Sequence, residues 1–368
     1  MSTTPTLRSR PRHARPAWSA PRIVVLIPAH DEEDRLPAAI AALHAQTRRP
    51  DTVTVIADNC TDRTARVAAD AGALVLLTSG NTDKKAGALN QGLNFLMPTL
   101  REHDLVLVQD ADTVIGPEFL AHASTALHGR AGAVGGIFYG DTGGGLLGTL
   151  QRIEFHRYAR EISRRKYRAD VLTGTATLFR VATLQHLKEA RRDGRLPGGD
   201  SYYCPASLTE DDEITKAVRT LGYRTLSPAG CAVTTEVMPS LGKLWHQRVR
   251  WQRGALENLR LYGLTPVTWP YFLRQIAMGL SVLALLLYLV FTVWMVIRGV
   301  PAISPLWVAV GTLFIAEKIV TARGAGIRCQ LLAATLVVEL VYDLFQHAVY
   351  LRCLYDFTRR RQERWLIT

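Results

Sequence analysis

The chain has 368 residues, 48% of them hydrophobic, and 44 lysines and arginines against 32 acidic residues give a formal net charge of +12. A disordered chain has fewer apolar residues, and a collagen needs glycine at every third position, whereas only 28 glycines occur here. Both classes are excluded. The five cysteines are an odd number without a CxxC pair, so we expect reduced thiols and neither a disulfide framework nor a structural zinc site.

The basic excess is concentrated at the two ends of the chain. Residues 1–22 carry five arginines and four prolines with no acid and no apolar run, which predicts a disordered basic tail and not a signal peptide. A second basic tail, 357–368, follows a long apolar segment. Basic residues beside hydrophobic spans favour a bilayer with anionic lipids on its cytoplasmic face as the partner. Nucleic acid is not expected, because no binding motif for it accompanies the charge.

Between Ile23 and Leu261, short β-branched runs alternate with amphipathic stretches. This pattern is typical of an α/β domain with a parallel or mixed sheet flanked by helices. The continuous apolar runs predict strands at 23–28, 52–58, 73–79, 104–110 and 132–138, all buried on both faces. Stretches 31–47 and 60–72 have apolar residues at helical spacing and predict crossover helices. We therefore expect a nucleotide-binding catalytic domain over 23–240.

The composition changes after Pro266. Residues 276–297 are 22 residues without a charge, enough for a transmembrane helix across about 30 Å of hydrocarbon. Segment 300–316, interrupted by two prolines, suits a short span or a re-entrant arm, and 329–351 is long enough for another span. We expect two or three spans within 271–356 and both basic ends in the cytoplasm. This describes a multi-pass protein of the plasma (inner) membrane with a cytoplasmic catalytic domain.

The segment 329–351 contains Glu339, Asp343 and His347 four residues apart, on one helical face. Two interpretations remain open. The stripe could be turned into the helix bundle and paired with Lys318 or Arg323, or it could line the path of a polar acceptor, since charges inside a membrane are costly.

Two carboxylates, Asp110 and Asp112, follow the predicted strand 104–110 with one residue between them. Such a pair at the carboxyl end of a strand can hold Mg²⁺ or Mn²⁺ and bridge it to substrate phosphates. A solvated acidic turn is the alternative. Asp58 ends another strand, where it could accept a hydrogen bond from a nucleobase or ribose or could cap the next helix. Lys84 and Lys85 precede a helix, where an ammonium and free N–H groups could meet a diphosphate.

Two further segments carry candidate chemistry. Four consecutive acids, 210–213, begin a predicted helix, which is more than capping needs, so one of them could be a general base for a sugar hydroxyl. The segment WHQRVRWQRG, 245–254, combines an indole, a common platform for sugars, with arginines that suit phosphate. Within 241–270, amphipathic helices at the membrane interface are an equal interpretation of this segment.

The motifs IPAHDEE, ADNCTDRTA, KAGALN, DADT, TEDDE and Gln247-x-x-Arg250-Trp251 occur in this order within residues 23–261. Together they resemble family 2 glycosyltransferases, specifically membrane-embedded processive synthases of the cellulose, hyaluronan and poly-N-acetylglucosamine type. The resemblance implies a GT-A fold followed by a C-terminal helical membrane region. It also implies a UDP-sugar donor, inversion at the anomeric carbon and a divalent cation, Mg²⁺ or Mn²⁺.

The resemblance also assigns roles to single residues. Asp211 takes the place of the general base, with Glu210 beside it in the catalytic motif. The implied donor contacts are Glu32, Asp58 on the uracil side, Lys85 near the diphosphate, Asp110, Gln247 and Arg250; the acceptor contacts are Thr209 and Trp251; the metal ligands are Asp110 and Asp112. Asp31 stands where the family usually has Asn, and Asn59 where many members have a second Asp. We therefore expect the nucleotide contact at these two positions to differ from the family pattern.

The function expected from these motifs is transfer of a sugar from a UDP-sugar to a growing polysaccharide at the cytoplasmic membrane face. Transfer of a single sugar to a lipid or polyprenyl-phosphate acceptor is the alternative, and a non-catalytic membrane scaffold is a third hypothesis. The intact acids argue against a scaffold. The Gln-Arg-Trp motif favours a polymer product, whereas the lack of membrane helices ahead of the catalytic domain favours single transfer or a channel built by a homo-oligomer.

Overall fold

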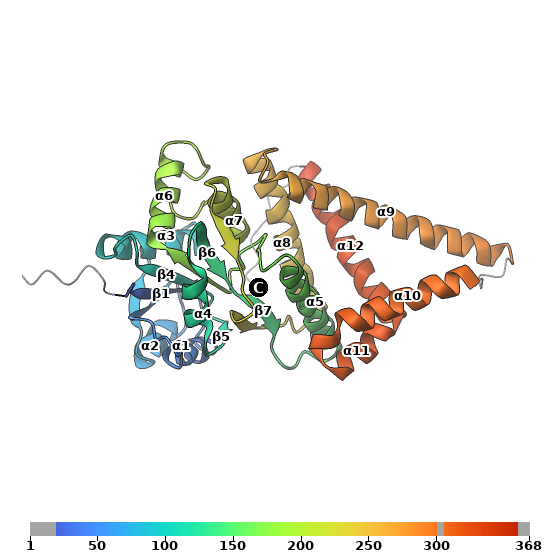
Figure 1. The fold of residues 1–368 in the computed structure, drawn as a ribbon, viewed down its shortest axis with the longest axis horizontal. Helices are drawn as coiled ribbons and strands as arrows, with labels where there is room; N and C mark the ends of the chain where they lie inside the picture. The colour runs from blue at the N-terminus through green and yellow to red at the C-terminus, as the bar shows by residue number, and fades with distance from the viewer. Residues whose placement is uncertain (1–19, 300–304, 360–368) are drawn as a thin grey trace, which may run out of the picture.

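The computed structural model describes residues 20–299 and 305–359. Most of the two predicted basic tails, 1–22 and 357–368, lies outside the described residues. Figure 1 shows an α/β unit at one end of the molecule and a group of long helices, α9 to α12, at the other.

A seven-stranded mixed sheet forms the centre of the α/β unit. Its strand order is β3-β2-β1-β4-β8-β6-β9, in which β8 alone runs antiparallel to its neighbours. The strands are β1 Ile23–Ala29, β2 Thr52–Ala57, β3 Leu74–Leu77, β4 Leu105–Gln109, β6 Ala131–Gly135, β8 Ala176–Arg180 and β9 Arg224–Leu226. A smaller sheet has the order β5-β10-β7, with β5 Val114–Ile115, β7 Ile137–Gly140 and β10 Ala232–Thr235. The predicted mixed sheet flanked by helices is confirmed.

Helices cover both faces of the large sheet because side chains of a strand alternate between its faces. Leu26 and Val106 pack with one set of helices, and Val25 and Leu107 pack with the other. The first set is α3 Lys84–Leu96, α6 Val181–Arg192 and α7 Glu210–Thr220; the second is α1 Leu36–His44, α2 Thr64–Asp70 and α4 Phe119–Ala126. The predicted crossover helices at 31–47 and 60–72 are α1 and α2.

Two predicted strands differ from the structure. The prediction that 73–79 is buried on both faces is wrong, because β3 is the edge strand and Leu74 and Leu77 are exposed. The run 132–138 is two strands, since β6 belongs to the large sheet and β7 to the small one. Gly136 separates them, and a Cβ there would lie 2.7 Å from a methyl carbon of Val233. A side chain would therefore obstruct the change of sheet.

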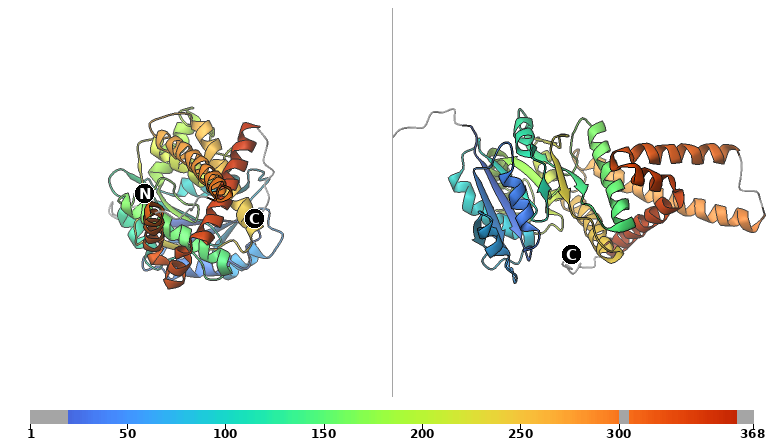
Figure 2. Two further views of the ribbon diagram at one scale, coloured as in Figure 1. Left: turned by 90° about the vertical axis from the view of Figure 1, so that its right-hand side faces the viewer. Right: turned by 90° about the horizontal axis from the view of Figure 1, so that it is seen from below.

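The helical part of the molecule packs on the α/β unit through two long helices, α5 Gly145–Arg164 and α8 Leu241–Tyr262. Beyond them lie α9 Trp269–Ile297, α10 Pro305–Thr321, α11 Ile327–Ala334 and α12 Leu336–Thr358. Helix α12 packs along α8, where the Cys353 thiol approaches the Val249 carbonyl oxygen at 3.5 Å. Helices α9 and α10 extend away from the α/β unit, as Figure 1 and the right-hand view in Figure 2 show.

Within the described residues, α9 is the one helix that is long and apolar enough to cross a membrane. Its 29 residues include an 18-residue window of mean hydropathy 2.6, of which 6% is buried. Helix α10 has only 17 residues, and α12 carries charged side chains along its length. The expected two or three spans are therefore supported for α9 only, and a multi-pass arrangement is not supported.

In the polar stripe of Glu339, Asp343 and His347 on α12, Glu339 is held by ion pairs. Glu339 is buried and accepts hydrogen bonds from both terminal nitrogens of Arg157 at 2.8 and 3.0 Å. The Lys318 ammonium lies 3.1 Å from Glu339 and 3.7 Å from Asp343. Lys318 was one of the two expected partners, whereas Arg157, on α5 of the α/β unit, was not expected. These contacts favour the paired interpretation over a lining for an acceptor path.

A second junction ties α9 to α7. The Tyr271 hydroxyl donates to the Asp170 carbonyl oxygen and accepts from Arg219 of α7 at 2.7 Å. The Lys216 ammonium, one turn earlier on α7, lies 4.4 Å from the centroid of the Tyr271 ring. The Asp170 carboxylate pairs with Arg219 and with Arg274 of α9. The base of the apolar helix is thus bonded directly to the C-terminal half of α7.

Candidate active site

Acidic side chains gather where the parallel strands of the large sheet end. Glu32, Asp58 and Asp110 follow β1, β2 and β4, which are neighbours in the sheet and run in the same direction. In open α/β sheets this carboxyl edge is where ligands bind. The predictions at these three positions therefore concern one edge of the sheet.

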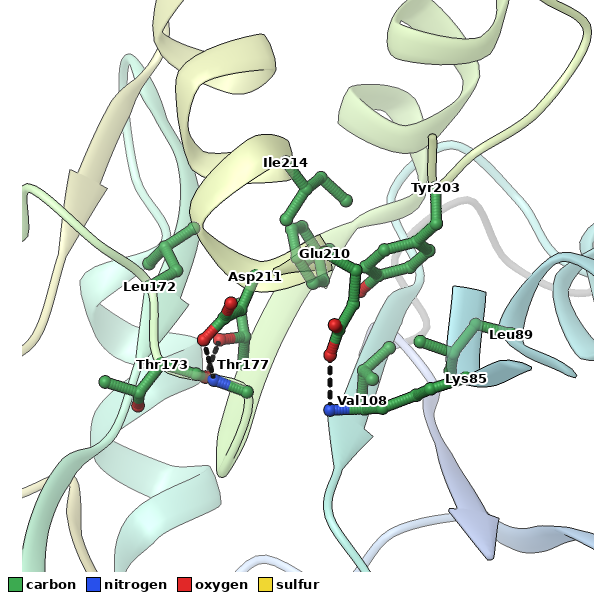
Figure 3. A pocket seen from close by; sticks show the side chains of 12 residues that line it. Lys85, Leu89, Val108, Leu172, Thr173, Thr177, Tyr203, Glu210, Asp211 and Ile214 are labelled. Carbon is green, nitrogen blue, oxygen red and sulfur yellow. Dashed lines mark hydrogen bonds and ion pairs between the residues drawn. The ribbon is translucent and has the colours of Figure 1, made fainter. Parts of the chain in front are cut away.

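Lys85 links this edge to α7. Its ammonium lies 2.6 Å from a carboxylate oxygen of Asp110 and 2.6 Å from one of Glu210. Although burial opposes it, the two carboxylates hold the pKa of Lys85 well above its ordinary value, so the side chain is a fixed cation. Burial also raises the pKa of Glu210, but Lys85 and the charge of Arg250 outweigh it and keep that pKa low. Figure 3 shows Lys85 and Glu210 pointing toward each other.

Asp211 lies beside this group and is directed to a different partner. One oxygen of its carboxylate accepts the Gly174 N–H at 3.1 Å, and the other accepts the N–H of Asp212 at 2.8 Å. Figure 3 shows Asp211 turned toward the loop of Thr173, while Glu210 turns toward Lys85. Burial, followed by repulsion from Glu210, raises the pKa of Asp211 to about 6. A carboxylate with that pKa is ionised at neutral pH and is a stronger base than a solvated one.

Gly174 is a site residue that the sequence analysis missed. A Cβ on it would lie 3.0 Å from the Lys85 ammonium, 3.3 Å from Asp110 and 3.6 Å from Asp211. The backbone of the loop between α5 and β8 therefore approaches all three groups, and a side chain would crowd them. A lone glycine between two threonines carries no signal of this role in the sequence.

Glu32 and Asp112 add two carboxylates near Asp110, close enough for the charges of these groups to interact. Burial, followed by the charges of Asp112 and Asp110, raises the pKa of Glu32 to about 7. Burial raises the pKa of Asp110 to about 7 as well, because repulsion from Asp112 and Glu210 adds to it and Lys85 compensates only part. An all-oxygen donor set with excess negative charge suits a hard cation such as Mg²⁺ or Mn²⁺. The residues therefore fit the expected cation at Asp110 and Asp112.

Another group of potential ligand atoms lies on the neighbouring loops. Among the described residues, Asp31, Cys60 and Asp62 have ligand atoms within 4.8 Å of one another. The Asp31 carboxylate already accepts the N–H groups of Thr61 and Asp62 and the Thr61 hydroxyl. These bonds hold the loop after β2 against the loop after β1. The positive φ of 55° at Asp31 suits Asp as well as the Asn usual in the family.

Asp58 is buried and held by three hydrogen bonds. Thr78 and Asn59 donate to one carboxylate oxygen at 2.7 and 3.1 Å, and Asn81 donates to the other at 2.8 Å. Asn81 also donates to the backbone carbonyl oxygen of Lys84, the residue before Lys85. The carboxylate is therefore fixed in position at the end of β2. Its predicted contact with the nucleobase stays a prediction.

The Gln-Arg-Trp motif lies on α8. The side-chain amide oxygen of Gln247 accepts from the Arg248 guanidinium at 2.7 Å, and that guanidinium lies 4.4 Å from the centroid of the Trp251 ring. Trp251 is 38% exposed. Arg250 is close enough to Glu210 to lower its pKa. The motif thus brings Arg250 toward the site, while Arg248 covers one face of the indole.

Thr209, a predicted acceptor contact, is buried against α8. Asn258 donates to the Thr209 hydroxyl at 3.1 Å and to Asp212 at 2.8 Å. A Cβ on Gly254 would lie 2.3 Å from that hydroxyl, so α8 packs tightly on the start of α7. The structure therefore gives Thr209 a role in joining the two helices, and its predicted contact with the acceptor stays a prediction.

Comparison with known proteins agrees with this geometry. The family model "Glycosyltransferase like family 2" matches residues 21–254. Poly-beta-1,6-N-acetyl-D-glucosamine synthase of Staphylococcus aureus is 24% identical over 245 residues, covering 64% of this chain and 55% of that protein. The probable glycosyltransferase YdaM of Bacillus subtilis is 29% identical over 255 residues, with the same coverage of 64% and 55%. The chain spans about half the length of these curated relatives.

A solved structure supports the fold. The mannosyltransferase PcManGT from Pyrobaculum calidifontis, in complex with GDP-Man and Mn²⁺, matches with a TM-score of 0.57 at 17% identity. The match covers 94% of this chain and 89% of that one. The GT-A fold expected from the sequence motifs is thereby confirmed. Since the family model covers more than half of the chain, the protein belongs to glycosyltransferase like family 2.

Proposed function

We propose that the protein transfers a sugar from a UDP-sugar to a growing polysaccharide, with inversion at the anomeric carbon, at the cytoplasmic face of a membrane. The observation that carries the proposal is the Lys85 ammonium between Asp110 and Glu210, 2.6 Å from each, with Asp211 beside them. A fixed cation suits a diphosphate and a buried carboxylate suits a base. The two requirements of a single displacement therefore lie side by side.

In this mechanism Asp211 takes the proton from an acceptor hydroxyl. The hydroxyl oxygen forms a bond to the anomeric carbon while the bond from that carbon to the diphosphate oxygen breaks. The N–H groups of Gly174 and Asp212 orient the base. Lys85 and Arg250 offset the negative charge that develops on the departing diphosphate. Because the hydroxyl attacks the face of the sugar opposite the departing diphosphate, the configuration at the anomeric carbon inverts.

Asp110 and Asp112, with Glu32 beside them, would hold a divalent cation, Mg²⁺ or Mn²⁺. Bound there, the cation would supply positive charge to the phosphate oxygens of the donor. The raised pKa values of Glu32 and Asp110, both about 7, support this assignment, because they arise first from burial and then from repulsion by Asp112, and a bound cation would offset both.

Donor and acceptor classes are proposed from the relatives and from the surface. The Staphylococcus aureus relative is named as a synthase of an N-acetylglucosamine polymer, which supports a UDP-sugar and a polymeric product. PcManGT is in complex with GDP-Man, so GDP-mannose is the donor to compare with a UDP-sugar. The exposed apolar side chains of α9 support contact with a bilayer. Its anionic lipids would meet the basic residues of the chain.

Single-sugar transfer to a lipid or polyprenyl-phosphate acceptor is the second candidate. It is favoured by the contact of Arg248 with Trp251, 4.4 Å from guanidinium to ring centroid, because this cation covers a face on which a polymer sugar would stack. Arg248 is itself buried and pairs with Glu154 at 2.9 Å, which holds it against the indole. Product length separates the two candidates.

The test is to incubate the purified chain in lipid with Mn²⁺ and radiolabelled UDP-N-acetylglucosamine, UDP-glucose or GDP-mannose. We expect one UDP-sugar to give product of many sugars, with inverted configuration by NMR. Preference for GDP-mannose would exclude the UDP donor, and an adduct of one sugar would replace synthesis by single transfer. The matched control is Asp70→Asn, on the exposed surface of α2, which should leave transfer unchanged while Asp211→Asn abolishes it.

A further inference from the structure

A second cavity, of about 280 Å³, lies apart from the proposed active site. It is lined by His128, Gly129, Arg130, Ala131, Lys166, Arg168, Arg224 and Leu226. None of these residues lines the pocket between Lys85 and Asp211. We infer that this cavity, the basic pocket, is a binding site for a phosphate-bearing anion that is distinct from the sugar donor.

The cations of the basic pocket lack acidic partners. No Asp or Glu lines it, and within the described residues none of its arginines or its lysine forms an ion pair with a carboxylate. The neighbouring arginines differ in this respect, since Arg165, Arg219 and Arg274 all pair with Asp170, two residues after Arg168. Acidic partners are thus available locally but are directed away from the pocket. Four uncompensated cations around one cavity create a positive potential that attracts an anion.

A turn with an unfavourable backbone conformation brings these cations together. Lys166 and Tyr167 have φ values of 54° and 59°, a left-handed conformation that side chains other than glycine seldom adopt. The turn is fixed by hydrogen bonds from Ser227 N–H to the Tyr167 carbonyl and from Ala169 N–H to the Thr225 carbonyl. Arg168 forms an isolated bridge with Leu226 as a result. The strained turn therefore brings a cation from the end of α5 to the edge strand β9.

The strand geometry then directs the remaining cations to the same face. Arg224 and Leu226 are two residues apart on β9 and so project to one face of the sheet. Arg130 directly precedes β6, the neighbour of β9, and donates to the Gly222 carbonyl oxygen at 3.0 Å. Guanidinium groups at two adjacent strand starts can each bind a phosphate through paired N–H groups. The cavity is large enough for a diphosphate or for a phosphodiester headgroup.

Two sources can supply this chemistry. One is a soluble phosphate compound; the other is the headgroup of an anionic phospholipid, because Asp170 joins the same chain segment to Arg274 of the apolar helix α9. In both cases the recognised group is the phosphate. Neither source depends on sugar transfer, so the inference stands or falls separately from the proposed function.

The test uses the full chain in uncharged detergent at low ionic strength. EDTA is present so that metal-dependent binding at the active site is suppressed. Isothermal titration with inorganic pyrophosphate examines the soluble source, and titration with a short-chain phosphatidylglycerol in the same micelles examines the lipid source. Phosphatidylcholine serves as the reference lipid. The variants are Arg168→Ala/Arg224→Ala and, for milder perturbation, Lys166→Ala.

We expect the double variant to weaken binding of at least one probe by about tenfold or more, and Lys166→Ala to weaken it less. Arg168→Lys/Arg224→Lys, which keeps the charge but loses the paired N–H geometry, should give an intermediate affinity. The matched control Arg66→Ala/Arg192→Ala removes two exposed positive charges elsewhere and should bind as the wild type does. A response to pyrophosphate alone identifies a soluble ligand, and a response to phosphatidylglycerol alone identifies a lipid. If wild type, Lys166→Ala and the double variant bind both probes equally, or wild type binds neither, the inference is overturned.

Discussion

Replacing Asp211 by Asn tests the catalytic assignment most directly. The amide has the size of the carboxylate and keeps an oxygen that can accept the Gly174 N–H, which the carboxylate accepts at 3.1 Å. It cannot take a proton from an acceptor hydroxyl. Loss of a general base typically lowers the rate by about 10²- to 10⁴-fold. That factor corresponds to about 2.7 to 5.4 kcal/mol in the activation free energy.

The Asp211→Asn substitution should leave the affinity for the nucleotide unchanged or raise it slightly, although it lowers the rate. Asp211 lies near Lys85, and the substitution removes one negative charge from the neighbourhood of the diphosphate. The affinity for UDP should therefore stay equal or increase slightly. The assay measures turnover of the donor at saturation and UDP binding by calorimetry, with Asp70→Asn as the matched exposed control.

The pH profile gives an independent readout. The groups that face Asp211 are Lys85, Glu210, Asp212 and the Gly174 N–H, and burial together with Glu210 raises the pKa of Asp211 to about 6. The base is active when ionised, so with saturating Mn²⁺, which would keep Asp110 and Asp112 ionised, wild-type turnover should fall as the pH drops through about 6 and level off above it. The Asn variant should lose this limb. Near-wild-type turnover in the variant would refute the reasoning and transfer the role to Glu210, because Asp212 is bonded to Lys216 and Asn258.

The remaining predictions address the metal, the acceptor and the helix junction. EDTA should abolish transfer, and Mg²⁺ or Mn²⁺ should restore it, since Asp110 and Asp112 repel a diphosphate without a cation; full turnover in metal-free buffer would contradict this. Trp251→Ala should shorten the product while UDP binding persists, because it removes a stacking contact worth about 0.5 to 1.5 kcal/mol, and Trp251→Phe should restore the length. Unchanged long product from the Ala variant would exclude a stacking role for Trp251. Arg157→Met should cost about 1.5 to 3 kcal/mol of unfolding free energy, because it removes the two hydrogen bonds from Arg157 to the buried Glu339, which keeps only Lys318 as a partner. Chemical denaturation measures this loss, Arg157→Met/Glu339→Gln should recover part of it, and equal stability of the single variant would refute the ion pair's role.

The sequence predicts a strand correctly where both faces of the strand are buried. Residues of β1, β2 and β4 form continuous apolar runs, and the structure buries them between two layers of helices. The run at 73–79 has the same composition but lies at the edge of the sheet, because strand order depends on pairing and not on hydrophobicity. The change of sheet at Gly136 was hidden for a related reason: its cause is the approach of Val233, almost 100 residues away in sequence.

The site was predictable to the extent that its residues follow recognisable motifs. Lys85, Asp110 and Glu210 come from three separate motifs. In the structure the Lys85 ammonium lies 2.6 Å from a carboxylate oxygen of each of the two acids. Gly174 and Asn81 belong to no such motif. Their roles arise from close approach and from hydrogen bonds to Asp58, which only the folded backbone specifies.

The junction at Tyr271 connects the apolar helix α9 to α7, so a movement of α9 would tilt α7. Helix α7 carries Glu210 and Asp211 at its start and is held near its end by Tyr271 through Lys216 and Arg219. Its 11 residues span about 16 Å, so a tilt of about 5° at the anchored end displaces the carboxylates by about 1.4 Å. A displacement of about 1 Å is enough to change a catalytic rate by orders of magnitude. We therefore expect the rate of the proposed transfer to depend on the thickness of a bilayer around α9, because hydrophobic mismatch changes the tilt of an apolar helix.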